Sequence, residues 1–377
     1  MILSETQKMI QETARDFARG RLAPGAAKRD EEAAFPTEEV KALGELGLMG
    51  MLIPEEYGGA GADYVSMALA IEEIAAADGA MSTIVSVQNS LVGAGLLKFG
   101  NDWQKKEFLT PLAQGKILGA FALSEPQAGS DAAALRCTAQ KQGDHYVLNG
   151  TKQFITSGKY ADIALVFAVT DKAAGKKGIS AFIVPTDTPG YSVPKVEDKM
   201  GQTSSDTAQL LFTDMKIPAT HLLGKEGEGY KIALSNLEGG RIGIASQCIG
   251  MARAALECAL PYAKERESFG KPIFAHQAVS FRLADMATEL EAARQLLHHA
   301  CALRDANQPC LKEACMAKLF ASEMAERVCS AAMQTLGGYG YLRDFPIERI
   351  CRDVRVAQIY EGTSDVQRII ISRELGN

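Results

Sequence analysis

Hydrophobic positions in the first third of the chain recur with helical spacing. The pattern runs from Ser4 to about Gly115 and is clearest over 37–46 and 64–77. Ser4 and Gln7 have the spacing of a capping box, in which each side chain bonds the other residue's backbone N–H. We therefore expect a helix to begin after Ser4 and a helical N-terminal domain to occupy residues 1–118.

After Gly115 the pattern changes to short apolar runs bounded by turn residues, which is typical of β-strands. Asn149-Gly150 lies between two of these runs, and both central residues of a type I′ turn need positive φ, so we expect a hairpin there. The sequence predicts a compact β domain, a barrel or sandwich, over residues 119–226. Its expected strands lie at 117–123, 146–148, 154–156, 163–169, 179–184 and 209–212.

Helical spacing returns from about Gly229. The clearest helix is expected at 278–304, where apolar residues follow one face. Long amphipathic helices joined by short breaks predict a helical bundle over residues 227–377. The expected fold is therefore mainly α, with a β domain in the middle.

Composition narrows the class of protein. The net charge of −6 argues against a nucleic-acid surface, which usually carries excess Lys and Arg. The eight cysteines include no C-x-x-C pair, and Cys301, Cys315 and Cys329 fall in helical patterns, so we expect reduced core residues. We find neither a metal-ligand motif nor a secretory or transit signal, and we identify no apolar run of membrane-spanning length. A cytoplasmic enzyme without a metal or membrane insertion is expected.

The stretch from Tyr360 to Asp365 is a short polar break between two helical patterns. Ser364 and Gln367 have capping-box spacing, so Glu361 is expected just before a helix N-terminus, where free N–H groups can bind a carbonyl oxygen. Gly362 permits close approach of the backbone to a ligand. A carboxylate in this setting suits proton abstraction next to a carbonyl. The alternative is that Glu361 only caps or solvates a loop.

These residues, followed by Gln367, Arg368 and the apolar run 369–371, resemble the C-terminal signature of the acyl-CoA dehydrogenases. The resemblance extends over nearly the whole chain and implies that family's three-part fold, in which the C-terminal part is a four-helix bundle. It also implies FAD as cofactor and oxidation of an acyl-CoA to the trans-2-enoyl-CoA. In this family pattern Glu361 removes the α-proton while a hydride passes from Cβ to flavin N5.

Two segments resemble the part of the family that surrounds the flavin ring. Residues 121–131 read by themselves as a strand leading into a hydroxyl-bearing loop, and Phe154 reads as an ordinary core aromatic. The resemblance instead implies flavin contacts for both segments, with Ser130 lying where flavin and CoA ligand meet. The residues implied are Phe121, Leu123, Ser124, Ser130, Phe154, Ile155 and Thr156, with Thr363 and Asp365 closing the flavin side.

Two further segments resemble those that hold the remainder of FAD. Residues 266–277 are similar to a segment that reaches across a subunit interface to a neighbour's FAD, which implies a homotetramer. Residues 334–340 are similar to the segment at the adenosine side, although by themselves they read as a helix C-cap and turn. The candidates are Arg266, Ser268, Phe269, His276, Gln277, Gln334, Gly337 and Gly338.

Residues 237–241 resemble the family helix that faces the acyl-CoA. Long-chain and isovaleryl members carry their base at the position of Gly240, and a glycine cannot abstract a proton, which leaves Glu361. One departure is Thr203, where many relatives carry Arg. The resemblance implies substrate contacts for Ser130, Glu238, Arg241, Tyr360 and Gly362.

The segments 239–247 and 275–291 are most similar to short-chain and short-branched-chain members, so a short-chain or short-branched-chain acyl-CoA is the expected substrate, with butyryl-CoA and 2-methylbutyryl-CoA the first to test. The resemblance implies electron-transfer flavoprotein as the electron acceptor. The sequence leaves open an acyl-CoA oxidase, a non-catalytic flavoprotein scaffold and a DNA-associated relative. It also leaves open whether fatty-acid metabolism or branched-chain amino acid degradation is served.

Overall fold

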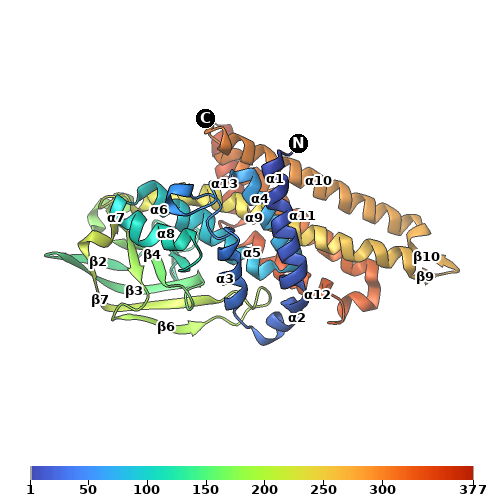
Figure 1. The fold of residues 1–377 in the computed structure, drawn as a ribbon, viewed down its shortest axis with the longest axis horizontal. Helices are drawn as coiled ribbons and strands as arrows, with labels where there is room; N and C mark the ends of the chain where they lie inside the picture. The colour runs from blue at the N-terminus through green and yellow to red at the C-terminus, as the bar shows by residue number, and fades with distance from the viewer. Residues whose placement is uncertain (1, 377) are drawn as a thin grey trace.

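A computed structural model describes residues 2–376 of the chain (Figure 1). Ser4 caps the first helix as predicted: the Gln7 N–H donates to Ser4 Oγ at 3.2 Å, and the Ser4 N–H donates to Gln7 Oε1 at 2.9 Å. The expected helix at 64–77 is confirmed with the same bounds. The N-terminal helices are α1 (Glu5–Phe17), α2 (Ala23–Glu32), α3 (Thr37–Glu45), α4 (Tyr64–Ala77), α5 (Gly79–Ser86), α6 (Ala94–Phe99), α7 (Asp102–Gln104) and α8 (Thr110–Ala113).

One helix corrects the expectation about apolar runs. The helices α5 and α6 are joined by the π-helical segment Val87–Gly93 into a single helix, Gly79–Phe99, which by length and composition alone could cross a membrane. Most of it is buried inside the protein. A core helix that is surrounded on all sides has this composition, because no face of it needs to be polar.

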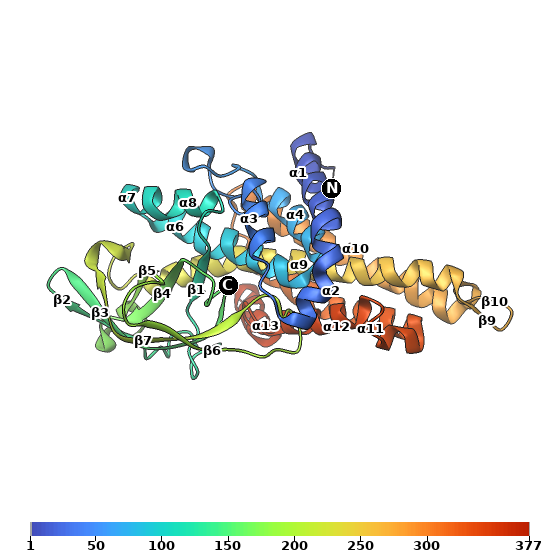
Figure 2. The ribbon, with the colours of Figure 1, turned by 60° about the horizontal axis from the view of Figure 1, so that its bottom comes forward.

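The middle of the chain forms one eight-stranded sheet in the order β6-β7-β3-β2-β4-β5-β8, with β1 paired in parallel to β4. Helices α6 to α8 lie over one side of it (Figures 1 and 2). The expected order of helical, β and helical parts is confirmed. The strands are β1 (Gly119–Ala122), β2 (Thr138–Gln142), β3 (His145–Thr156), β4 (Ile163–Val169), β5 (Ile179–Pro185), β6 (Tyr191–Val196), β7 (Thr207–Pro218) and β8 (Leu222–Leu223).

The hairpin predicted at Asn149-Gly150 is wrong. Both residues lie inside β3, where a register shift between Leu148 and Gly150 marks a bulge. A Cβ on Gly150 would lie 2.7 Å from Cys137 Cα, so the glycine serves a close backbone approach. The turn between β2 and β3 instead contains Gly143, with φ +65°.

The C-terminal part is helical, and the helix expected at 278–304 is confirmed as α10. The long helix α9 packs against both α4 and α11, which ties the first and last parts of the chain together. All eight cysteines are free, and Cys301, Cys315 and Cys329 are buried as expected. The elements are α9 (Gly229–Glu265), β9 (Glu267–Ser268), β10 (Lys271–Pro272), α10 (Gln277–Asp305), α11 (Leu311–Leu336), α12 (Ile347–Val354) and α13 (Ser364–Leu375).

Candidate active site

Glu361 lies in a tight loop that leads into α13. The helix begins one residue earlier than the capping-box prediction requires: its N-cap is Thr363, whose hydroxyl accepts the Val366 N–H at 3.3 Å. Gln367 is buried, and its amide donates to the carbonyl oxygens of Glu361 (3.0 Å) and Gly362 (2.9 Å). The predicted capping box is therefore wrong, and Gln367 holds the loop instead of the helix end.

The loop has a strained backbone. Glu361 adopts φ +54°, which is uncommon for a residue with a side chain, and Gly362 follows at φ +86°. Lys318 on α11, which is fully buried, donates from Nζ to the Gly362 carbonyl oxygen at 2.7 Å. Burial lowers the pKa of Lys318 to about 8. Bonds from α11 and α13 thus fix the backbone that aims the Glu361 side chain.

The carboxylate of Glu361 lies against Gly240 of α9. A Cβ built on Gly240 would lie 2.6 Å from Glu361 Oε2 and 2.9 Å from Cδ, so a side chain there would displace the carboxylate. Oε2 is buried and accepts no hydrogen bond from any group among residues 2–376. A carboxylate oxygen without a partner is available to take up a proton.

The environment of Glu361 sets its titration near neutrality. Burial raises its pKa from 4.5 to about 7, and the nearby Arg241 and Lys318 limit the rise. Arg241 is also buried, and its Nε has no partner within the described part of the chain. A carboxyl group that ionises near pH 7 suits a general base, because it is available as carboxylate and still basic enough to hold a proton.

The two segments predicted to surround the flavin ring are neighbours in the structure. The Gln153 N–H donates to the Ser124 carbonyl oxygen at 2.9 Å, next to a bulge between Lys152 and Ile155. This bulge gives Phe154 φ +60° and leaves its side chain 65% exposed, so it is not a core aromatic. Ser124 and Thr156 are half-buried beside it, and Ser130 is exposed in the following loop.

Ile155 differs from its neighbours in this group. Its side chain is buried in the sheet core, because alternate residues of a strand face opposite sides. Phe121 also packs inward, with its ring 4.9 Å from that of Phe167. The Ile155 side chain is therefore closed to a ligand, whereas Phe121 is only half-buried, and the flavin contacts of both residues remain predictions.

Sequence reasoning missed the ion pair under this surface. Lys152 Nζ lies 2.8 Å from Glu125 Oε1 with both side chains buried, and it also donates to the Leu123 carbonyl oxygen at 3.1 Å. Glu125 accepts the N–H groups of Arg136 (2.6 Å) and Cys137 (3.0 Å). Burial raises the pKa of Glu125, but Lys152 outweighs it and holds the pKa below its usual value. The pair fixes both ends of the loop that contains Ser130, and no local pattern marks it.

The second set of predicted cofactor residues lies elsewhere. The β9–β10 hairpin is at the far end of the long helices from the sheet (Figures 1 and 2). There the Arg266 guanidinium lies 5.8 Å from the Tyr339 ring, which brings the segments 266–277 and 334–340 together. Phe269 at the tip is 95% exposed with φ +54°. One chain therefore presents these residues away from Phe154 and Glu361.

The predicted substrate residues differ in whether their polar atoms are already bonded within the protein. Glu238 Oε1 is bound by Arg304 at 2.7 Å and by the Cys310 thiol at 3.0 Å. On the neighbouring side, Gly239 borders a cavity of about 320 Å³ that is also lined by Tyr64 and Ser90. Near the loop, the Tyr360 hydroxyl is bonded within the protein, and the exposed Asp365 lies 3.5 Å from Arg368.

Across the described residues, no group of three or more His, Cys, Asp or Glu could hold a metal ion.

Sequence models of three acyl-CoA dehydrogenase domains match the chain: the N-terminal domain over 4–116, the middle domain over 120–215 and the C-terminal domain over 227–376. The chain therefore belongs to the acyl-CoA dehydrogenase family. This confirms the resemblance and identifies the protein as an enzyme of that class.

Individual relatives agree over their full length. An acyl-CoA dehydrogenase of Bacillus subtilis is 51% identical, with 100% of this chain and 99% of the relative covered. The short-chain specific acyl-CoA dehydrogenase of Rattus norvegicus mitochondria is 50% identical, with 99% and 90% covered. The butyryl-CoA dehydrogenase structure from Megasphaera elsdenii superimposes with a TM-score of 0.98 at 44% identity, covering 100% of both chains.

Proposed function

We propose that this enzyme oxidises a short-chain or short-branched-chain acyl-CoA to the trans-2-enoyl-CoA, with Glu361 as the base that removes the α-proton. The observation that carries the proposal is the Glu361 carboxylate itself. Its Oε2 is buried against Gly240 and has no partner among the described residues, and burial raises the pKa of the carboxyl group to about 7. The short-chain preference is supported by the relatives named for short-chain and butyryl-CoA substrates.

The surface around Phe154 fits a flavin ring. The bulge in β3 holds a large aromatic side chain in the open at the cost of a strained backbone, beside the half-buried hydroxyls of Ser124 and Thr156. Phe154, Ser124 and Thr156 would hold the ring, with Thr363 and Asp365 on the side of the Glu361 loop. FAD, when bound, supplies the acceptor for the hydride that leaves Cβ. A related structure, 32% identical with a TM-score of 0.96, is of PigA with FAD and proline.

Removal of the α-proton places negative charge on the thioester oxygen, which needs a donor. Within residues 2–376, the Glu361 N–H makes no hydrogen bond, so it can donate to that oxygen. Loss of one such donor typically costs on the order of a hundredfold in rate. The strained loop therefore supplies both the base and a donor.

The two separated sets of cofactor residues support an oligomer. Arg266, Phe269 and Gln334 are exposed at the far end of the helices, so they would complete the FAD site of a second copy. An Arg guanidinium matches two pyrophosphate oxygens at once. We propose a homotetramer, which the family resemblance implies. Electron-transfer flavoprotein is the proposed electron acceptor, and a related structure is described as the electron transferring flavoprotein of Acidaminococcus fermentans.

An anaerobic titration of the purified protein tests the function. Butyryl-CoA or 2-methylbutyryl-CoA is expected to bleach the flavin absorbance. The Glu361→Gln variant is expected to bind flavin and ligand, but its flavin should be reduced roughly a hundred- to ten-thousandfold more slowly. Glu31→Gln, a change at an exposed Glu on α2, serves as the matched control. Near-normal reduction by Glu361→Gln would remove Glu361 as the base. A clear preference for long-chain thioesters would overturn the substrate class.

A further inference from the structure

Four polar side chains from four distant segments close a hydrogen-bonded ring beside Glu361. They are Gln202 from the loop between β6 and β7, Thr83 of α5, Gln247 of α9, and Tyr360. Gln202, Thr83 and Gln247 are each at most 4% exposed. We call these four residues the Gln202 ring.

The direction of each bond around the ring is consistent. The Tyr360 hydroxyl donates to Gln247 Oε1, and Gln247 Nε2 donates to Thr83 Oγ1 at 2.5 Å. Thr83 Oγ1 donates to Gln202 Oε1 at 2.6 Å, and Gln202 Nε2 donates back to the Tyr360 hydroxyl at 3.2 Å. Each of the two hydroxyls donates one of these bonds and accepts another, so the four bonds run in one sense around the ring. Gln247 Nε2 also lies 2.8 Å from the Gly79 carbonyl oxygen and 2.7 Å from Ser82 Oγ, so its two N–H groups are shared among three acceptors.

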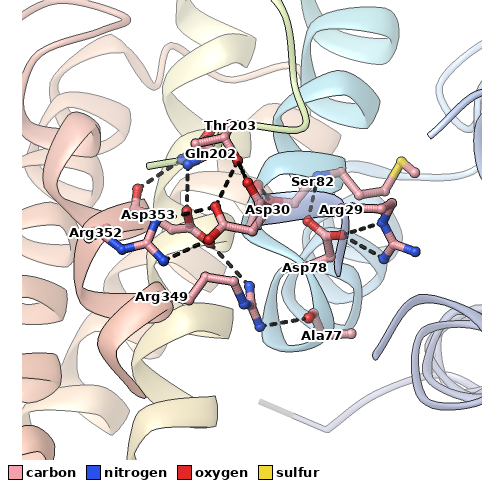
Figure 3. A network of polar contacts seen from close by, with 12 residues as sticks. Arg29, Asp30, Ala77, Asp78, Ser82, Gln202, Thr203, Arg349, Arg352 and Asp353 are labelled. Atoms are coloured by element: carbon pink, nitrogen blue, oxygen red, sulfur yellow. Dashed lines mark hydrogen bonds and ion pairs between the residues drawn. The ribbon is translucent and has the colours of Figure 1, made fainter. Parts of the chain in front are cut away.

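The ring is fixed to α12 through Gln202. Its backbone N–H donates to Asp353 Oδ1 at 2.5 Å, and its Nε2 also donates to the Asp353 carbonyl oxygen at 3.0 Å (Figure 3). Asp353 is paired in turn with Arg349 at 3.2 Å. The next residue, Thr203, is not part of the ring, and its hydroxyl donates to Asp30 Oδ1 of α2 at 2.7 Å (Figure 3). Gln202 is therefore held rigidly while it holds Tyr360.

Tyr360 is the residue immediately before Glu361, whose φ of +54° is strained and persists only because surrounding contacts impose it. Lys318 and Gln367 hold the loop on the C-terminal side of Glu361, through the carbonyl oxygens of Gly362 and of Glu361 itself. The Gln202 ring holds the opposite side. A shift of about 1 Å at a reacting group can cost about a hundredfold in rate.

We propose that Gln202 is a positioning residue: through the ring it clamps Tyr360, and thereby keeps the Glu361 carboxylate aimed past Gly240 at the substrate α-carbon. This inference rests on the proposed role of Glu361. Gln202 belongs to the β part of the chain, which carries the proposed flavin surface, whereas Glu361 belongs to the helical part. The ring thus fixes the position of the proton-accepting half of the site relative to the hydride-accepting half.

Exchange of the α-protons of acetyl-CoA in D₂O tests the positioning role by itself. Acetyl-CoA has α C–H bonds but no β-carbon, so no hydride can leave. Glu361 takes a proton, the proton exchanges with solvent, and a deuteron returns to Cα. Mass spectrometry of the thioester then measures the action of the base, and the concentration dependence of the rate reports ligand affinity.

Gln202→Leu and Tyr360→Phe are each expected to lower the saturated exchange rate about 10- to 100-fold, with half-saturation within about threefold of the parent. The double variant is expected to match the single ones, because both changes break the same ring. Thr203→Val removes a hydroxyl from the same loop but outside the ring, and is expected to exchange within about twofold of the parent. Tyr360→Phe deletes only one oxygen and keeps the experiment informative if Gln202→Leu does not fold.

Each outcome separates the two proposals. If Glu361→Gln exchanges at the parental rate, the proposed base is wrong. If Glu361→Gln loses exchange but Gln202→Leu and Tyr360→Phe retain it while their melting temperatures fall, the ring is only structural. Multiplicative losses in the double variant would show that Gln202 does not act through Tyr360, and would also overturn the inference.

Discussion

Replacing Gly240 by alanine should separate the catalytic geometry from the stability of the fold. The new Cβ would lie 2.6 Å from Glu361 Oε2, whereas ordinary contacts begin at 3.4 Å, so the carboxylate must move by roughly 0.8 Å. The three nearest atoms all belong to the end of the Glu361 side chain, which can swing aside without moving the backbone. Meanwhile alanine in a helix interior is favoured over glycine by about 0.5–1 kcal/mol.

We therefore expect Gly240→Ala to melt at the parental temperature or slightly above it, while anaerobic flavin reduction by butyryl-CoA slows by about a hundredfold. Stopped-flow absorbance and thermal denaturation measure the two effects. Gly20→Ala is the matched control, because a Cβ there meets nothing within 4 Å. Parental reduction by Gly240→Ala would refute the reasoning, since the carboxylate would then not need the space that Gly240 leaves.

Two other changes test the electrostatics. Burial raises the pKa of Glu361 from 4.5 to about 7, so the folded protein loses stability as pH rises through that window. In denaturant unfolding, Glu361→Gln should therefore raise the free energy of unfolding by about 1–3 kcal/mol more at pH 8 than at pH 5. An equal effect at both pH values would contradict the burial argument. Lys152→Met leaves Glu125 buried without its charged partner and should cost about 3–5 kcal/mol, whereas Lys195→Met, which removes a largely exposed lysine from its pair with Glu197, should cost under about 1 kcal/mol. Equal losses for the two lysine variants would show that the buried pair does not support the loop.

The sequence by itself determined the order of the parts and the base candidate. Apolar spacing predicted the helix at 64–77 with the bounds observed, and predicted α10 to within one residue at each end. The polar break at 360–365 with its glycine drew attention to Glu361. These signals are local: period and cap chemistry depend on residues a few positions apart, which the chain alone specifies.

Local signals failed where two structures share one pattern. Asn149-Gly150 is compatible with both a tight turn and a strand bulge. In the sheet it forms the bulge, because Gly150 packs closely against the backbone of Cys137. Ser364 and Gln367 have capping-box spacing, yet Thr363 became the N-cap because Gln367 is drawn inward to the Glu361 loop.

Only the tertiary structure decided the environment of the base. The four residues of the Gln202 ring are far apart in the sequence, at positions 83, 202, 247 and 360. Lys152 and Glu125 are likewise separated within the β part. A buried polar group must find a partner wherever the fold supplies one, so its partner is not readable from its neighbours in sequence. Desolvation of Glu361, which sets its pKa, depends likewise on how α9, α11 and the loop come together around it.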